Sequence, residues 1–239
     1  MSLSQIRFVL VNTSHPGNIG ATARALKNMG LERLYLVDPL EYPHAEATAR
    51  ASGADDLLAR AVVCATLEEA VADCALVLGA SARLRTLPWP VVEPREAAAR
   101  AMALAGEAQV AVVLGREHSG LTNQELERCN ALVHIPSNPR YSSLNVAAAA
   151  QVLAYELHLA AREAPPAPET DGPLATGADM EGLYAHLEQV LVEVDYLDPG
   201  NPRQLMRRLR RLFNRAQLER MELNILRGVL TAVQKKTGR

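Results

Sequence analysis

The sequence lacks the residue spacings that usually hold a metal ion. Its three cysteines contain no CxxC pair, and its six histidines form no HxxxH or HExxH pair. We therefore expect no bound metal. The cysteines, Cys64, Cys74 and Cys129, are expected to be small buried hydrophobes in a reducing compartment.

Long apolar runs are also missing. No run reaches the roughly 20 residues that a membrane helix needs, and the N-terminus has neither the charged start nor the apolar stretch of a signal peptide. The sequence therefore predicts a cytoplasmic protein that does not interact with membranes.

The fingerprints of nucleotide-binding loops are incomplete. Gly115–Gly120 has GxxxxG spacing, but Leu121 and Thr122 follow where a phosphate-binding loop has Lys and then Ser or Thr. The turn Pro16–Gly20 lacks the GxGxxG spacing of a dinucleotide site. Both patterns argue against a nucleoside triphosphate or a nicotinamide dinucleotide as the ligand.

Charge is nearly balanced over the chain, with a formal net charge of −2, so the average does not indicate a polyanion-binding protein. The distribution of charge is uneven. Residues 178–200 contain six Asp or Glu and no Lys or Arg, whereas residues 201–239 contain eleven Lys or Arg and two Asp or Glu. This asymmetry suggests a surface for nucleic acid or another acidic partner near the C-terminus.

Short apolar runs alternate with helical patterns over residues 1–164, which predicts an α/β domain. The runs are continuous rather than alternating, as in strands that are buried on both faces. Expected strands are 6–12, 33–37, 61–65, 75–80, 110–114 and 132–135, and expected helices are 19–29, 67–72, 93–105, 123–128 and 144–162. The predicted fold class is a mostly parallel sheet with helices on both faces.

A proline-rich linker is expected at residues 165–178, followed by a small helical extension at 179–239. In the extension, Asn201 and Pro202 suit a helix start. Arginines within thirteen residues are too numerous for one helix face and predict a broad cationic surface: Arg203, Arg207, Arg208, Arg210, Arg211 and Arg215. This surface could bind RNA, or the acidic residues 179–198 could neutralise it within a dimer.

Three polar segments follow expected strands: Asn18–Arg24, Gly115–Leu121, and the stretch from Ile135 to Val146. Ligands bind outside the carboxyl ends of the strands in open α/β sheets, so these segments form a candidate site. Each segment alone is ambiguous. Asn18 can simply cap a helix that carries a solvated Arg24, and Glu117 can simply cap a helix or pair with Arg116.

The helix expected at 144–162 has two notable features. Ser142 or Ser143 suits its N-cap, and its unpaired N–H groups would suit an acceptor on a ligand. The alanine run Ala147–Ala150 allows close packing against a neighbouring helix or subunit. This helix is therefore expected in a dimer interface.

In order and spacing, the three segments resemble the motifs of the SPOUT superfamily of RNA methyltransferases, in its 2′-O-ribose branch. The resemblance covers nearly all of residues 5–162. Residues 11–20, 81–90 and 207–213 further resemble the bacterial tRNA (cytidine/uridine-2′-O)-methyltransferases, which modify nucleotide 32 in the anticodon loop. Position 80 is Ala where Thr or Gly is expected in relatives, and the change should matter little at a backbone contact.

The resemblance implies a trefoil knot, a homodimer, tRNA as substrate and S-adenosylmethionine as cofactor. It assigns catalysis to Arg24. It assigns cofactor contacts to Ala80, Ser81, Ala82, Gly115, Ile135, Ser142, Ser143 and Leu144. Contacts with the substrate or the RNA are expected from Asn18, Arg83, Arg85, Arg116, Glu117 and Asn145.

Methyl transfer to a ribose 2′-OH needs alkoxide character at that oxygen. Arg24 stays protonated in proteins, so it suits positioning the adjacent phosphate and stabilising the developing alkoxide rather than removing a proton. His15 and His118 are candidate bases, beside the phosphate and water. Alternative functions are methylation of rRNA or of another tRNA position, and a knotted RNA-binding protein without catalytic activity.

Overall fold

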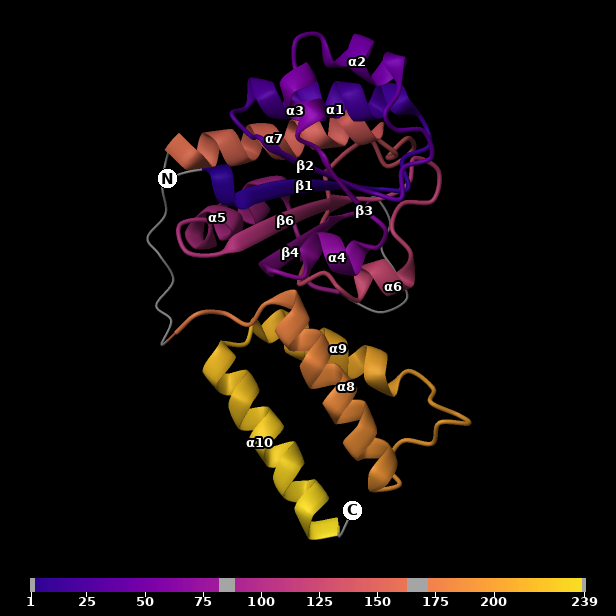
Figure 1. The fold of residues 1–239 in the computed structure, drawn as a ribbon, viewed down its shortest axis with the longest axis vertical. Coiled ribbons are helices and arrows are strands. Elements are labelled where there is room, and N and C mark those ends of the chain that lie inside the picture. The colour runs from indigo at the N-terminus through magenta and orange to yellow at the C-terminus, as the bar shows by residue number, and fades with distance from the viewer. Residues whose placement is uncertain (1–2, 82–88, 163–171, 238–239) are drawn as a thin grey trace.

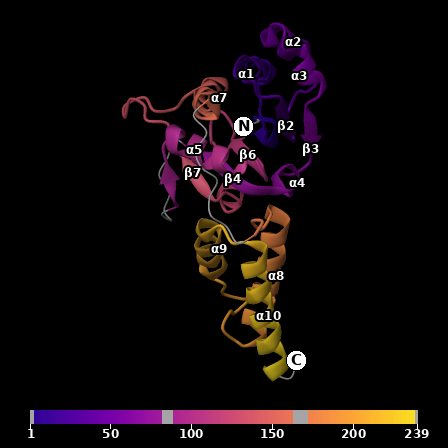
Figure 2. The same cartoon turned by 90° about the vertical axis from the view of Figure 1, so that its left-hand side faces the viewer.

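The computed structural model describes residues 3–81, 89–162 and 172–237. Figure 1 shows an α/β domain above a helical extension, and Figure 2 shows the same two parts from the side. The elements in chain order are η1 (Leu3–Gln5), β1 (Ile6–Val11), α1 (Pro16–Asn28), β2 (Arg33–Val37), α2 (Ala45–Ala51), α3 (Asp55–Ala59), β3 (Val62–Cys64), α4 (Leu67–Val71), β4 (Cys74–Ala80), β5 (Val91–Val92), α5 (Pro94–Leu104), β6 (Gln109–Leu114), α6 (Asn123–Leu126), β7 (Ala131–Val133), α7 (Val146–Arg162), α8 (Gly177–Glu193), α9 (Leu205–Ala216) and α10 (Arg220–Thr237).

The α/β domain is built on a seven-stranded sheet with the order β3-β2-β1-β6-β4-β7-β5. Every pairing between these strands is parallel. The carboxyl ends of the strands therefore meet at one edge of the sheet. The predicted fold class is confirmed, while the knot stays a prediction.

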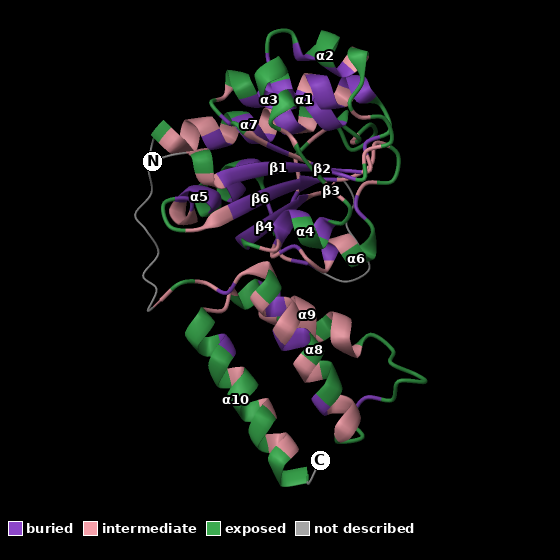
Figure 3. Ribbon diagram, viewed as in Figure 1, coloured by how far each residue is buried: buried purple, intermediate pink, exposed green. Residues whose placement is uncertain are grey.

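Helices cover both faces of the sheet. Successive residues of a strand point to opposite faces, so Phe8 and Leu10 of β1 pack in one hydrophobic cluster with α1, α2, α3, α5 and α7. Val9 and Val11 pack in a second cluster with α4 and α6. Figure 3 shows the buried residues gathered in the sheet between these layers. Burial on both faces explains why the strands read as continuous apolar runs.

Four elements of the domain are not predicted by the sequence: η1, α2, α3 and β5. α2 and α3 are short and mix alanine or leucine with charged residues, so they show no long helical period. β5 has two residues, of which Val91 is exposed. By contrast, β2 covers the predicted residues 33–37 without any shift.

Helix α1 begins earlier than the pattern indicates, because His15 is its N-cap. The His15 ring Nδ1 accepts a hydrogen bond from the Gly17 N–H at 3.1 Å. Asn18 therefore lies inside the first turn, and the prediction that it caps the helix is wrong. Gly20 does allow a close approach, since a Cβ there would lie 2.0 Å from the Ala47 carbonyl oxygen in α2.

The alanine-rich face of α7 packs within the chain. Ala150 and Ala154 are completely buried in the cluster that α7 shares with α1 and α5. Ala147 and Ala150 of the alanine run are therefore packed against this chain's own helices, whereas Ala148 is exposed. Tyr155 of α7 remains exposed, and the homodimer stays a prediction.

The extension contains α8, α9 and α10. A reciprocal capping box between Thr176 and Asp179 starts α8. Helix α9 begins at Leu205 after Gln204, so the helix start expected at Asn201 and Pro202 is wrong. The extension's own buried cluster is small and consists of Ala175, Met180, Leu183, Tyr184 and Leu223. Within the described residues, no helix combines the length and apolar composition needed to cross a membrane.

Candidate active site

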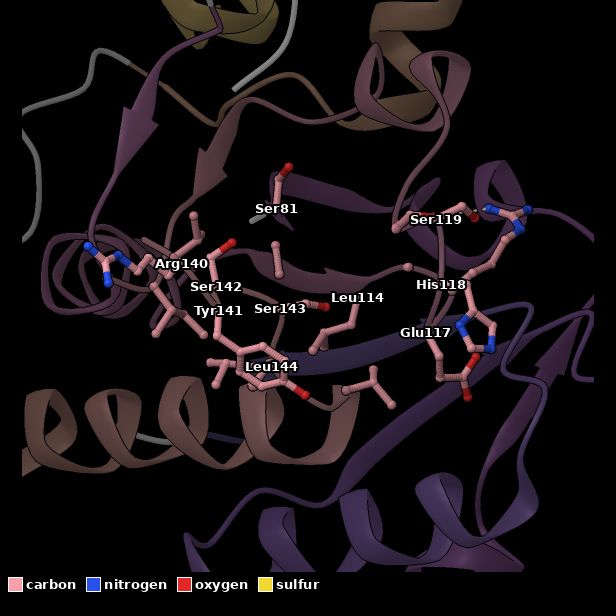
Figure 4. A pocket seen from close by; sticks show the side chains of 18 residues that line it. Ser81, Leu114, Glu117, His118, Ser119, Arg140, Tyr141, Ser142, Ser143 and Leu144 are labelled. Carbon is pink, nitrogen blue, oxygen red and sulfur yellow. Dashed lines mark hydrogen bonds between the residues drawn. The ribbon is translucent and has the colours of Figure 1, made fainter. Parts of the chain in front are cut away.

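A cavity of about 360 Å³ opens at the carboxyl edge of the sheet. Figure 4 shows its lining side chains converging from three directions. They come from the end of β4, from the loop after β6 and from the segment between β7 and α7: Ala80, Ser81, Leu114, Gly115, Arg116, Glu117, His118, Ser119, Gly120, Val133, Ile135, Arg140, Tyr141, Ser142, Ser143, Leu144, Val146 and Ala149. The cavity therefore brings together the second and third polar segments of the sequence.

Of the expected cofactor contacts, those in the described chain line this cavity: Ala80, Ser81, Gly115, Ile135, Ser142, Ser143 and Leu144. Ala82, Arg83 and Arg85 lie outside the described residues.

Gly115 is needed for the shape of the loop beside the cavity. A Cβ at Gly115 would lie 2.3 Å from the Gly120 carbonyl carbon. The loop closes on itself, because the Arg116 N–H donates to the Gly120 oxygen at 3.2 Å and the Gly120 N–H donates back at 2.9 Å. Gly120 has φ +69°, which a side chain would disfavour. The loop is thus held against the cavity by its own backbone.

Three side chains connect the three polar segments. The Asn145 Nδ2 donates to the Asn18 Oδ1 at 2.9 Å, and the Asn18 Nδ2 donates to the Glu117 Oε1 at 3.0 Å. Glu117 also accepts hydrogen bonds from the Ser14 N–H and Oγ, at 3.2 and 3.1 Å. We call Asn18, Glu117 and Asn145 the site triad.

The Glu117 carboxylate is held in its ionised form. Burial opposes its ionisation, but the hydrogen bonds from Asn18 and Ser14 outweigh burial and lower the pKa of Glu117 below its ordinary value. The alternative that Glu117 pairs with Arg116 is wrong. Glu117 instead binds groups at the start of α1.

Asn145 is also the residue that caps α7. Its Oδ1 accepts hydrogen bonds from the N–H groups of Ala147 and Ala148, at 2.9 and 3.4 Å. The predicted capping role of Ser142 or Ser143 is therefore wrong. Both serines lie in the turn before the cap, where they line the cavity.

Arg24 lies on α1, exposed to solvent, and is not among the residues that line the cavity. It follows Asn18 by six residues, which places it about 9 Å further along the helix axis. Within one chain, the structure therefore brings Asn18 to the site and leaves Arg24 outside the cavity wall.

Arg116 has protein partners of its own. Its Nη1 and Nη2 donate to the two oxygens of Glu125 at 2.9 and 3.0 Å, and its Nη2 also contacts the Asn12 Oδ1. Glu125 is part of the capping box that starts α6. The Arg116 guanidinium thus joins the cavity loop to α6 and to the end of β1.

The two candidate bases differ in their surroundings. The His15 Nδ1 is the acceptor that caps α1, and its Nε2 lies 3.9 Å from the Glu46 Oε1. His118 lines the cavity (Figure 4). The structure therefore places His118, and not His15, at the cavity wall.

Arg140 and Tyr141 are cavity residues that sequence reasoning did not assign. They form a turn in which the Tyr141 N–H donates to the Asn138 carbonyl oxygen at 2.8 Å. Tyr141 is 82% exposed at the mouth of the cavity. Its position in a proline-punctuated loop directly before the serine pair was the available signal.

The fold is that of the SpoU methylases. Residues 5–155 match the SpoU rRNA Methylase family, and residues 178–239 match the C-terminal domain of tRNA methyltransferase TrmJ.

Comparison with individual proteins assigns the chain to a narrower group within this family. The tRNA (cytidine/uridine/adenosine-2′-O-)-methyltransferase TrmJ of Pseudomonas aeruginosa (strain UCBPP-PA14) is 53% identical over 244 residues, covering 98% of this chain and 95% of that protein. The crystal structure of TrmJ from Z. mobilis ZM4 has a TM-score of 0.82 and 34% identity, covering 95% of this chain and 98% of that one. The chain therefore belongs to the TrmJ methyltransferases of the SpoU family.

A solved structure of lower sequence identity shares the fold. The SpoU methyltransferase AviRb from Streptomyces viridochromogenes, in complex with the cofactor AdoMet, matches with a TM-score of 0.53 and 20% identity, over 65% of this chain and 60% of that one.

Proposed function

We propose that the chain catalyses S-adenosylmethionine-dependent 2′-O methylation of tRNA, at cytidine or uridine 32 of the anticodon loop. The site triad carries this proposal, since it joins all three polar segments beside one cavity. The names of the TrmJ relatives support tRNA as the substrate and the ribose 2′-oxygen as the acceptor. Nucleotide 32 rests on the resemblance in the sequence. With tRNA as substrate, we expect the enzyme to act in the cytoplasm.

The cavity suits S-adenosylmethionine. Its volume of about 360 Å³ lies within the range of about 300–1,000 Å³ that is usual for small-molecule sites. Leu114, Val133 and Ile135 would cover the adenine, and the backbone of the 142–144 turn would offer N–H and C=O groups to its edge and to a carboxylate. When bound, the cofactor supplies a methyl group on a positively charged sulfur.

Arg24 is proposed to act on the RNA rather than on the cofactor. Its exposed position on α1 leaves the guanidinium accessible to a large substrate. A permanently charged guanidinium there would position the phosphate beside the target ribose and stabilise negative charge developing on the 2′-oxygen.

His118 is the favoured candidate among the side chains that could accept the 2′-OH proton, because it lies at the cavity wall. His15 already uses its Nδ1 as a helix cap. His118→Ala should therefore slow the chemical step more than His15→Ala, and a loss of about 10²-fold or more would fit a general base. If both variants have equally small effects on the rate, the 2′-OH proton is accepted by the phosphate or by water.

One observation bears on the choice between tRNA and rRNA. The domain matches a family described by rRNA methylation, but the extension matches the C-terminal domain of a tRNA methyltransferase. Both parts are present in one chain, so tRNA is favoured.

The deciding experiment is nucleoside mass spectrometry of unmodified tRNA after incubation with the purified protein and S-adenosylmethionine. We expect 2′-O-methylcytidine or 2′-O-methyluridine at position 32, with adenosine at that position as a further substrate to test. The control is the same tRNA with a 2′-deoxyribose at nucleotide 32, which should give no product. Methylation of rRNA with none of tRNA would overturn the proposal, and failure to retain labelled S-adenosylmethionine would indicate a non-catalytic RNA-binding protein.

A further inference from the structure

The extension contacts the α/β domain through a partly buried polar cluster. Asn214 of α9 is 5% exposed, and its Nδ2 donates to the Glu127 carbonyl oxygen at 2.8 Å. Its own carbonyl oxygen accepts a hydrogen bond from the Asn130 Nδ2 at 3.2 Å. Arg207 adds an ion pair with the Glu127 carboxylate. We call Asn214, Arg207, Glu127 and Asn130 the docking cluster.

The docking cluster lies next to the active site in the chain. Glu127 is the C-cap of α6, the short helix that follows the cavity loop. Asn130 directly precedes β7, whose end lines the cavity. In Figure 1, the connection between α8 and α9 lies on the same side as α6. The extension therefore holds the segment that connects two walls of the cavity.

Two of the six arginines of the expected cationic surface are neutralised inside the protein. Arg207 pairs with Glu127, and Arg210 forms two hydrogen bonds with the Glu181 carboxylate, at 2.6 and 2.9 Å. Arg210 also lies over the Tyr184 ring, with 4.4 Å between its guanidinium carbon and the ring centroid. Arg207 thus joins the extension to the domain, Arg210 joins α9 to α8, and both guanidiniums are already paired.

The other four have no carboxylate partner within the described residues. We call them the free arginines: Arg203, Arg208, Arg211 and Arg215. Arg211 is half-buried and the other three are exposed.

Helix geometry separates the two sets. Arg207, Arg210 and Asn214 are spaced i, i+3 and i+7, so they lie within about 60° of arc on α9. Arg208, Arg211 and Arg215 have the same spacing one residue later, and so form a second stripe rotated by about 100°. Each of the three residues Arg207, Arg210 and Asn214 is thus followed directly by a free arginine on another side of the helix.

We propose that the docking cluster fixes the orientation of α9, so that the free arginines contact backbone phosphates of the same RNA whose ribose is methylated in the cavity. The proposal rests on the proposed function and assigns two roles to neighbouring residues. Arg207 and Asn214 are positioning residues. Arg208, Arg211 and Arg215 are RNA contacts.

Neighbouring arginines provide matched variants for the test. Binding of unmodified tRNA to the full chain is measured by fluorescence anisotropy as a function of salt concentration. Arg208→Gln should weaken binding several-fold and reduce the slope of log affinity against log salt by about 0.7–0.9, because one phosphate contact is lost. Arg207→Gln should also weaken binding but leave the slope unchanged, because only the effective concentration of α9 at the RNA falls.

Further variants test the coupling and control for charge. Glu127→Gln should add nothing to Arg207→Gln, since the two side chains act as a pair, but should add to Arg208→Gln. Arg100→Gln on α5, whose helix packs on the opposite face of the sheet, removes one positive charge and should leave affinity and slope unchanged. Asn214→Ala should raise KM for tRNA about 3–10-fold with little change in kcat.

Two results would overturn the proposal. One is an equal loss of slope in Arg207→Gln and Arg208→Gln, which would make Arg207 an RNA contact. The other is a wild-type slope in the triple variant Arg208→Gln, Arg211→Gln, Arg215→Gln. The binding measurements do not depend on methyl transfer. A wild-type protein that binds tRNA but methylates none would therefore overturn the proposed function, while the binding test of the arginines would still give a result.

Discussion

The α/β domain and the helical extension are held together in different ways. The domain buries a hydrophobic cluster on each face of its sheet. The extension has one small cluster, and its α10 leaves Met221, Ile225 and Val229 exposed at i, i+4 and i+8. The domain can therefore hold reacting groups at fixed distances, whereas the extension is joined to it by fewer contacts, among them the polar docking cluster and a hydrogen bond from the Ala178 N–H to the Ala72 oxygen at 2.9 Å. We expect substitutions in the domain to slow the methyl-transfer step, and substitutions in the extension to weaken the affinity for the substrate.

The largest effect should come from Arg24→Ala. Loss of the charge that stabilises the developing alkoxide should slow methyl transfer by at least about 10²-fold, while the thermal unfolding temperature and S-adenosylmethionine affinity stay near wild type. Single-turnover kinetics and calorimetric titration measure these quantities. Near-normal turnover in this variant would show that Arg24 is not catalytic. The free arginines of the extension should instead alter KM.

Substitutions at two glycines, Gly20 in the domain and Gly182 in the extension, compare the packing of the two parts through their effects on stability. Gly20→Ala should destabilise the domain by about 3 kcal/mol, because its Cβ would lie 2.0 Å from the Ala47 carbonyl oxygen. Gly182 is in α8, where a Cβ meets nothing closer than the Arg227 Nη1 at 3.8 Å. Gly182→Ala should therefore stabilise the extension by about 0.5–1 kcal/mol. Urea unfolding measures both, and destabilisation by Gly182→Ala would contradict the packing described here.

Removal of the extension should separate its role from that of the cavity. A chain that ends at residue 168 should bind S-adenosylmethionine as the full chain does, because the cavity residues all lie in the domain. Its affinity for tRNA should fall, and its salt slope should decrease by about 2–3, because the three proposed RNA contacts of α9, Arg208, Arg211 and Arg215, are lost. If this shorter chain binds tRNA with the full affinity and slope, the extension does not contact the RNA.

The smallest effect concerns acid stability of the site triad. Because the pKa of Glu117 is lowered in the folded state, its ionised form stabilises the fold above its unfolded pKa of about 4.5, and this contribution is lost as pH falls through the folded value. Glu117→Gln should therefore lose less unfolding free energy than wild type between pH 6 and pH 3.5. Unfolding midpoints in urea across this range measure the difference. A parallel loss in both proteins would show that Glu117 does not contribute.

Prediction from the sequence was most accurate for elements that are defined by a local pattern of apolar residues. Leu34, Leu36 and Val37 of β2 are buried and Tyr35 between them is half-buried, so this local apolar run is enough to define the strand. The start of α1 was missed because His15 is an unusual cap, and the partners of Arg116 were missed because Asn12 is 104 residues away in the chain. The separation of Arg207 from Arg208 depends on where the extension docks, which no spacing in the sequence reveals.

The site triad has a fixed direction of donation. The Asn145 Oδ1 must accept from the start of α7, so its amide nitrogen has to face Asn18. Asn18 must then present its oxygen to Asn145 and its nitrogen to position 117, where only an acceptor is compatible. The amide at the start of one helix thus dictates, through a second amide, the chemical character of a group on a distant loop. Asn18→Asp would remove the amide donor of residue 18 and set two carboxylates against each other. A one-atom change in the middle of the chain of hydrogen bonds is thereby expected to disturb both of its ends.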